Sequence, residues 1–151
     1  MSVVISKSTN RLAKLLRKPG GAITVSRALN SAKVNLDAIR PECCRTIDRI
    51  LEDMAALFDA GKGLENAPTL YKLSNQVVGF AGSMDMMELS QAAYSLCETL
   101  DRMITAERWS SPPVQVHLAA MSRLRQVDGN QDICKAIIDG LKRVAAQIAL
   151  S

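Results

Sequence analysis

The chain has 151 residues with few aromatic side chains and many alanine, leucine and methionine residues, a composition that suits one domain of helices packed on helices. Its apolar runs are shorter than the roughly 20 residues of a membrane-spanning helix, and its first residues lack the order of a signal peptide. Four cysteines and one histidine lack metal-ligand spacing. We therefore expect a reduced, cytoplasmic protein without metal or cofactor.

The net charge of +4 is concentrated at the N-terminal end, where residues 1–40 hold eight basic side chains and one acid, Asp37. We predict a basic arm over residues 1–21, containing a short amphipathic helix, RLAKLLRK, and a helical domain over residues 22–151. The arm could dock on its own domain, on a partner or on an anionic membrane surface. Nucleic-acid binding is not expected, because no aromatic or fold signature accompanies the charge.

From Thr24 to about Gly61, apolar side chains recur every three and four positions, which predicts a helix that packs on others. Pro41 lies inside this pattern. Because proline has no N–H group and crowds the preceding turn, we expect a kink or a break near Arg40. Gly61 can adopt the left-handed conformation that ends many helices. The predicted core positions are Leu29, Ala32, Leu36, Ile39, Cys43, Ile47, Ile50, Met54 and Phe58.

The next helix is predicted to run from Asn66, followed by Pro68 in its first turn, to Met84. One side gathers Leu70, Leu73, Val77, Phe80, Ala81 and Met84, and we assign this side to the core. The opposite side carries Tyr71, Asn75, Val78, Gly79 and Gly82. Glycine costs about 1 kcal/mol relative to alanine in a helix interior, so two glycines here indicate that something comes close to the backbone. We interpret this side as a docking face. The alternative is a helix buried on both sides, with the glycines packed against the N-terminal helix.

Three further helices are expected. Asp85 followed by Glu88 fits a capping-box start for a helix over residues 86–104, and the short link before it makes the two helices antiparallel. Its predicted core face is Leu89, Ala93, Leu96, Leu100 and Met103. Ser111 is expected to cap a helix whose core face is Val114, His117, Leu118, Met121 and Leu124. After a turn at residues 128–130, the last helix is predicted to bury Ile133, Ile137, Ile138, Leu141, Val144, Ala145 and Ile148.

No strand pattern competes with these helices, so the predicted fold is all-α. We expect an antiparallel, up-and-down four-helix bundle with additional N-terminal and C-terminal helices. Trp109 is expected to close one end of it. No helical HExxH, paired carboxylates or glycine-rich phosphate loop is present, so we predict that the protein is not an enzyme. His117, at the edge of a core face, is interpreted as a packed bundle residue, with a phosphoacceptor role as the alternative.

The segment NQVVGFAGSMDMMELSQAAYSLCETLD, residues 75–101, resembles the phosphoacceptor hairpin of histidine-containing phosphotransfer (HPt) domains. Those domains share the loose pattern H-x-L-K-G-x-A-G-x-x-G-x-x-x-L across one helix, a tight turn and the next helix. The matching residues of this chain are Gly79, Ala81, Gly82 and Leu89. The resemblance implies an HPt-like bundle and a surface that fits a two-component receiver domain.

The same alignment places Asn75 at the phosphoacceptor histidine, Val78 at the neighbouring lysine and Asp85 at the turn glycine. An amide is not nucleophilic and cannot carry the phosphoryl group that an imidazole nitrogen carries. A protein of this kind could bind a receiver domain without exchanging phosphate with it. We therefore expect partner contacts at the docking face and no phosphotransfer at Asn75.

A second resemblance concerns the stretches RKPGG, LYKLSNQVVGFAG and AAYSLCETLDRM, which are similar to small chemotaxis-cluster proteins of the CheE type. Together, the two resemblances imply a non-catalytic, HPt-like signalling adaptor in chemotaxis that binds a response-regulator receiver or a histidine kinase. Two alternatives are a phosphotransfer protein that uses His117 and a scaffold whose basic arm binds an anionic surface.

Overall fold

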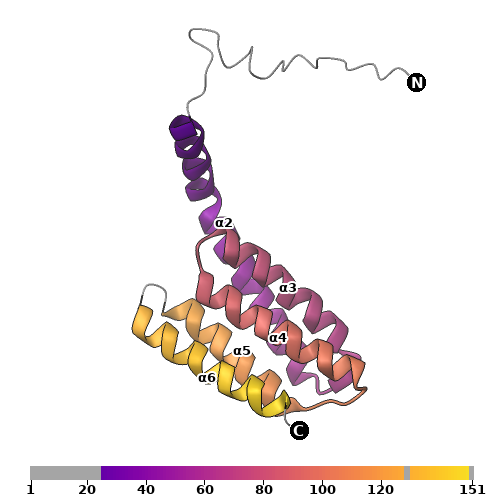
Figure 1. The fold of residues 1–151 in the computed structure, drawn as a ribbon. Coiled ribbons are helices and arrows are strands. Elements are labelled where there is room, and N and C mark those ends of the chain that lie inside the picture. The colour runs from indigo at the N-terminus through magenta and orange to yellow at the C-terminus, as the bar shows by residue number, and fades with distance from the viewer. Residues whose placement is uncertain (1–24, 128–129, 150–151) are drawn as a thin grey trace, which may run out of the picture. The chain divides into compact units, whose positions relative to one another are not determined.

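The structure is a computed structural model that describes residues 25–127 and 130–149. These residues form five α-helices and one short 3-10 helix, without a strand among them, so the predicted all-α class is confirmed (Figure 1). Contacts divide the chain into two units, residues 1–38 and residues 39–151. The predicted basic arm, residues 1–21, lies outside the described residues.

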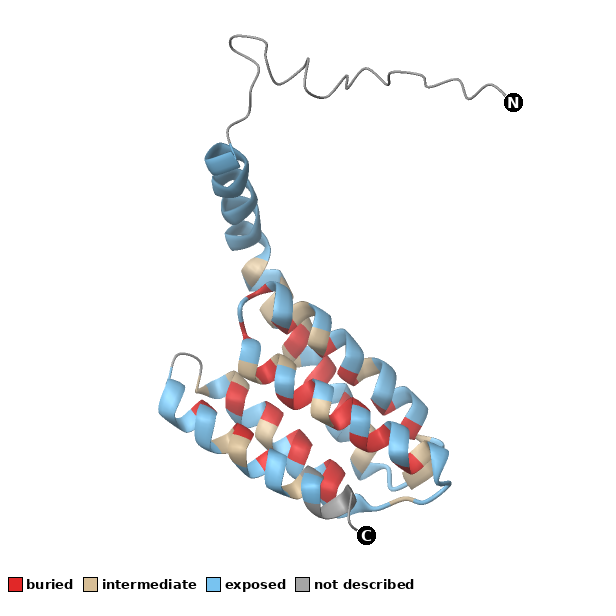
Figure 2. Cartoon of the chain, viewed as in Figure 1, coloured by how far each residue is buried: buried red, intermediate tan, exposed pale blue. Residues whose placement is uncertain are grey.

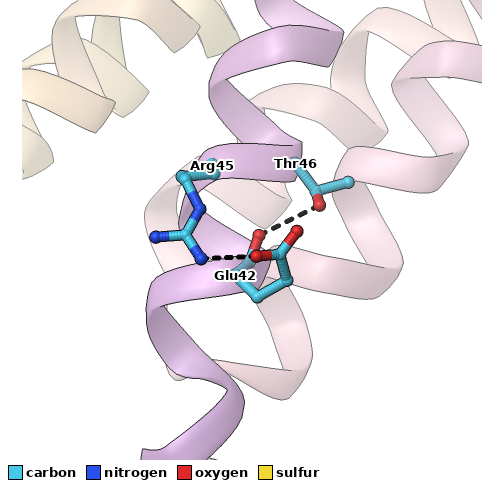
Figure 3. Close-up of polar contacts among 3 residues, drawn as sticks. All are labelled: Glu42, Arg45 and Thr46. Atoms are coloured by element: carbon cyan, nitrogen blue, oxygen red, sulfur yellow. Dashed lines mark hydrogen bonds and ion pairs between the residues drawn. The ribbon is translucent and has the colours of Figure 1, made fainter.

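Helix α2 spans Val25–Asp59 without interruption and contains Pro41, so of the kink or break predicted near Arg40 the break is wrong, and the kink stays a prediction. In the first turn after the proline, Arg45 pairs with Glu42, and Thr46 Oγ1 donates a hydrogen bond to the Glu42 carbonyl at 3.0 Å (Figure 3). The hydrogen bond from Arg45 lowers the pKa of the Glu42 carboxyl group. These contacts lie in the turn after the proline, whereas the hydrogen bond that Pro41 cannot make belongs to the turn before it, at the Asp37 carbonyl.

Only part of the predicted core face of α2 is buried. Ile47, Ile50 and Met54 are buried, and Cys43 and Phe58 are half-buried against the core. Leu29, Ala32, Leu36 and Ile39 are exposed, so these four predictions are wrong. Helical periodicity identifies an apolar face, but a residue is buried only where a neighbouring element covers it. Gly61, with φ of +70°, follows the helix in the left-handed conformation that was predicted for it.

The 3-10 helix η1 spans Gly63–Glu65, and α3 then spans Ala67–Ser83 with Pro68 in its first turn, as predicted. The side chain of Asn66 donates a hydrogen bond to the Leu57 carbonyl at 2.8 Å instead of capping α3. The predicted core side of α3 is confirmed. Leu70, Val77, Ala81 and Met84 are buried, and Leu73 and Phe80 are half-buried.

Helix α4 spans Met87–Thr105, α5 spans Ser111–Gln126 and α6 spans Gln131–Ala149. Helix α4 contacts α3, α5 and α6, and it lies between α3 and α6 in Figure 1. Every predicted core residue of α4 and α5 is buried, and Figure 2 shows the buried positions along the sides where the helices meet. These helices share one core with the second half of α2.

The core face of α6 differs from the prediction. Ile138 and Leu141 are buried, but Ile133 is 38% exposed and Cys134 is buried beside it. The buried stripe therefore runs through positions 134, 138 and 141, one position away from the predicted start. Ile137 and Val144 are half-buried, and the predicted positions Ala145 and Ile148 lie among side chains that the structure does not describe.

Two predicted helix caps are wrong. Asp85 has φ of +60° and is not the N-cap of α4; that position is Met86, without a side-chain capping bond. The N-cap of α5 is Ser110, and the Ser111 hydroxyl instead accepts a hydrogen bond from Trp109 Nε1 at 2.9 Å. Trp109 is half-buried against the core, consistent with its expected place at one end. None of the described helices is long and apolar enough to cross a membrane.

Candidate functional site

The five residues of the predicted docking face lie on one side of α3, and we call them the α3 face. They are Tyr71, Asn75, Val78, Gly79 and Gly82. Val78 is half-buried and the other four are exposed, with 38% of Tyr71 accessible to solvent. Asn75 is therefore open to solvent within the described part of the chain.

The two glycines of the α3 face are not needed for packing within the described part of the chain. A Cβ atom built on Gly79 would meet no atom within 4 Å. A Cβ atom on Gly82 would meet only the Ser90 hydroxyl, at 3.6 Å, which is an ordinary contact. The alternative prediction, in which the glycines pack against the N-terminal helix, concerns residues outside the described ones.

Three side-chain hydrogen bonds to the backbone join α3 and α4. Ser74 Oγ donates to the Ala93 carbonyl at 2.7 Å, and Ser90 Oγ donates to the Val78 carbonyl at 3.1 Å. The Cys97 thiol donates a weaker bond to the Tyr71 carbonyl, with sulfur and oxygen 3.8 Å apart. These bonds fix the rotation of α3, because Ser74 is fully buried on the side that faces α4. They therefore keep the α3 face turned away from the core.

The α3 face is nearly free of charge. Lys72 is the one charged residue in the sequence of α3. An uncharged face that combines a tyrosine, an amide and exposed backbone suits a protein surface as its ligand. Lys72 is exposed and precedes Asn75 by three positions, so one cation lies beside this face.

The turn between α3 and α4 is held from two sides. The Met86 N–H donates to the Ala81 carbonyl at 2.9 Å, and Arg40 Nη2 donates to the Met84 carbonyl at 2.8 Å. Asp85 adopts a left-handed conformation, a region that favours glycine. In the alignment with HPt domains, Asp85 occupies the position of the turn glycine.

His117 lies in the core between α5 and α4 and has no solvent-exposed surface. Its Nδ1 atom is 2.7 Å from the Pro113 carbonyl, and its Nε2 atom is 2.9 Å from Ser95 Oγ. A carbonyl oxygen only accepts hydrogen bonds, so Nδ1 carries the proton and Nε2 accepts from the Ser95 hydroxyl. Burial lowers the pKa of the imidazole, and the bond to Pro113 partly offsets this effect. In this conformation neither ring nitrogen is open to an external phosphoryl group.

The hydrogen bond between Ser95 and His117 was not predicted from the sequence. The two residues are 22 positions apart on different helices, and no spacing rule links them. The sequence also gave no sign of a groove of about 620 Å³ between α4 and α6, which Ser95 lines. Val78 lines this groove too, so the groove adjoins the α3 face.

We also searched the described part of the chain for metal sites and reactive cysteines. No group of three or more His, Cys, Asp or Glu side chains there is placed to hold a metal ion. Cys43, Cys44, Cys97 and Cys134 are not paired in disulfides. Burial raises the pKa of the Cys97 thiol, which keeps it protonated and unreactive at neutral pH. Comparisons with family models, curated proteins and solved structures found no significant match for this chain.

Proposed function

We propose that this protein is a non-catalytic, HPt-like signalling adaptor that binds a response-regulator receiver domain or a histidine kinase through the α3 face. The proposal depends mainly on one observation: Gly79 and Gly82 are exposed, and nothing in the described part of the chain requires their small size. A glycine in a helix interior is destabilising, so its presence without an internal packing reason favours an external one.

The turn after α3 gives independent support to the alignment with HPt domains. That family has a glycine where this chain has Asp85, and Asp85 has φ of +60°. L-amino acids rarely adopt this conformation, and aspartate and asparagine are the non-glycine residues that tolerate it best. Glycine adopts this conformation without strain, so a left-handed residue at the aligned position supports the alignment.

Asn75 determines the chemistry of the proposed adaptor. It is exposed on the α3 face, where a phosphoacceptor histidine would stand in the aligned family. Its amide can donate and accept hydrogen bonds but cannot attack an aspartyl phosphate. The adaptor would therefore occupy a receiver domain without removing its phosphate, and could compete with an active phosphotransfer protein for the same surface.

Arginine substitutions at the two glycines test the proposal. Gly79→Arg and Gly82→Arg each place a long cation on the α3 face, and the space at Gly79 allows the variant to fold. We expect each to lower affinity for the receiver domain or histidine kinase that binds the unmodified protein by about tenfold or more, as measured by isothermal titration calorimetry. Gln115→Arg is the matched control, because it adds the same charge at an exposed position of α5. Folded glycine variants that bind with unchanged affinity would contradict the proposal.

A separate measurement tests the absence of phosphotransfer. Incubation with a phosphorylated receiver should leave no acid-labile phosphate on the protein. Asn75→His introduces an imidazole at the exposed position, and we expect it to be the better phosphoacceptor of the two forms. Acid-labile phosphate on His117 of the unmodified protein would instead support the phosphotransfer alternative.

A further inference from the structure

The groove between α4 and α6 contains a serine that is hydrogen-bonded to the only histidine in the chain. Ser95 Oγ is 2.9 Å from His117 Nε2, and the opposite ring nitrogen is 2.7 Å from the Pro113 carbonyl. The bond to Pro113 sets the tautomer, so that the unprotonated nitrogen faces the serine hydroxyl. This is the arrangement of a serine nucleophile, its general base and a group that orients the base, with a backbone carbonyl in the third position.

His117 is neutral, as a general base must be before it takes a proton, and the burial that keeps it neutral also lowers its basicity. It is fully buried, and burial favours the neutral imidazole at neutral pH. No rotation of the ring is needed to receive the Ser95 proton, because the hydrogen bond is already made. The hydrogen bond from His117 Nδ1 to the Pro113 carbonyl also holds the ring, so that Nε2 stays directed at Ser95 Oγ.

Ser95, unlike His117, is reached from outside the core. It is only partly buried, and it lines the groove of about 620 Å³. The groove has a largely apolar wall, to which Val78, Tyr94, Ile138 and Leu141 contribute. Such a wall suits an aliphatic chain rather than a sugar or a nucleotide.

Two side chains with N–H donors line the groove, as does one carboxylate, Glu98, three positions after Ser95. Gln91 lies one helical turn before Ser95 on α4, and Lys142 comes from α6. Lys142 is 72% exposed and lies 3.9 Å from Asp139, the outer limit of an ion pair, so this contact constrains its ammonium group little. Amide and ammonium groups are the side-chain donors that can stabilise negative charge on an attacked carbonyl oxygen.

We propose that Ser95 is an acyl-accepting nucleophile that takes the acyl group of an ester with a short aliphatic chain. Ser95 Oγ attacks the ester carbonyl carbon while its proton moves to His117 Nε2. The bond between the carbonyl carbon and the leaving oxygen then breaks, and the proton passes from His117 to that oxygen. The products are O-acyl-Ser95 and the free alcohol, with neutral His117 restored.

This inference does not rest on the proposed adaptor function. Ser95 and His117 lie outside the α3 face, and accepting one acyl group requires no turnover. Loss of receiver binding in the glycine variants and loss of acylation at Ser95 are therefore separate results. Val78, which belongs to both surfaces, is left unchanged in every test.

The test uses the full chain with p-nitrophenyl butyrate. We expect release of about one equivalent of p-nitrophenolate per chain, followed by a butyryl adduct that peptide mapping assigns to Ser95. Ser95→Ala should abolish the adduct. Ser122→Ala is the matched control, because Ser122 is an exposed serine of α5 that does not line the groove. His117→Gln should slow acylation by about 100-fold, the effect expected from loss of a general base.

Peptide mapping of the butyryl adduct uses the unmodified chain, so this part of the test does not depend on whether a variant folds. The proposal is overturned if no adduct forms, if the label is confined to lysines, or if Ser95→Ala is labelled as fast as the unmodified chain. Equal acylation rates with and without His117 in folded proteins would also overturn it, because Ser95 would then have no activating partner.

Discussion

Arg40 Nη2 donates a hydrogen bond to the main-chain carbonyl of Met84 at 2.8 Å, and this bond ties α2 to the turn between α3 and α4. Met84 is the C-cap of α3, where carbonyl groups lack partners within the helix. The guanidinium group satisfies one of them and also places a positive charge at the negative end of the helix dipole. A residue 44 positions away in the sequence thus supports the turn that ends the α3 face.

Arg40→Ala should therefore destabilise the protein. A hydrogen bond from a charged donor contributes about 1.5 to 3 kcal/mol, and Arg40 is only half-buried, so we expect a loss near the lower value. Urea denaturation followed by circular dichroism measures the free energy of unfolding. Arg49→Ala, at an exposed position of α2, is the control and should change stability by less than about 0.5 kcal/mol. Equal losses in the two variants would show that the bond to Met84 is not stabilising.

Gly79→Ala tests whether the α3 face is free in the whole protein. A Cβ atom at this position meets nothing within 4 Å, so alanine should raise the free energy of unfolding by about 1 kcal/mol through its higher helix propensity. Gly140→Ala is the matched control in α6, because its Cβ atom also has no neighbour within 4 Å. Stabilisation at position 140 with destabilisation at position 79 would indicate that part of the chain outside the described residues packs on Gly79.

The left-handed turn residue gives a third prediction. Asp85 has φ of +60°, a conformation that is sterically strained for residues with a Cβ atom. Glycine is unstrained there, and alanine is more strained than aspartate. We expect Asp85→Gly to be more stable than Asp85→Ala by about 1 kcal/mol, as measured by thermal denaturation. An alanine variant that is the more stable of the two would show that the turn is not left-handed in solution.

Core faces were predicted correctly from the sequence for helices whose apolar side is covered by neighbouring helices. The core sides of α3, α4 and α5 follow from a spacing of three and four residues because each of these helices is covered along its length. The same spacing failed for Leu29 and Leu36, which are exposed, since a periodic pattern carries no information about what covers it. In α6, Ile133 was chosen for its hydrophobicity, but the smaller Cys134 is the buried residue.

The α3 face and the Ser95–His117 pair also differ in how far the sequence predicts them. The α3 face could be predicted because its glycines and its amide lie on one helix, at positions that helical geometry relates directly. Asp85 was misread as a cap, because sequence does not reveal the backbone angle that makes it a turn residue. Ser95 and His117 meet only through the packing of α4 on α5, and no local pattern encodes that contact.

The fourth prediction concerns the pH dependence of stability. Burial holds the pKa of folded His117 below its ordinary value of 6.5, and the unfolded chain regains that ordinary value. As the pH falls below about 6.5, the unfolded state therefore binds a proton that the folded state does not, and stability is lost until the pKa of the folded state is reached. Above pH 6.5 this contribution is fully present. One proton limits the slope to about 1.4 kcal/mol per pH unit.

Urea titrations at several values between about pH 7 and pH 5 measure this slope, because most carboxyl groups stay ionised in that range. His117 is the only histidine in the chain, so His117→Gln should make the free energy of unfolding nearly independent of pH there. The glutamine also retains groups that can donate to Pro113 and accept from Ser95, which favours a folded control. A slope that persists in the variant would assign the titration to another group. A flat profile in the unmodified protein would mean that His117 titrates alike in the folded and unfolded states, and hence that burial does not lower its pKa.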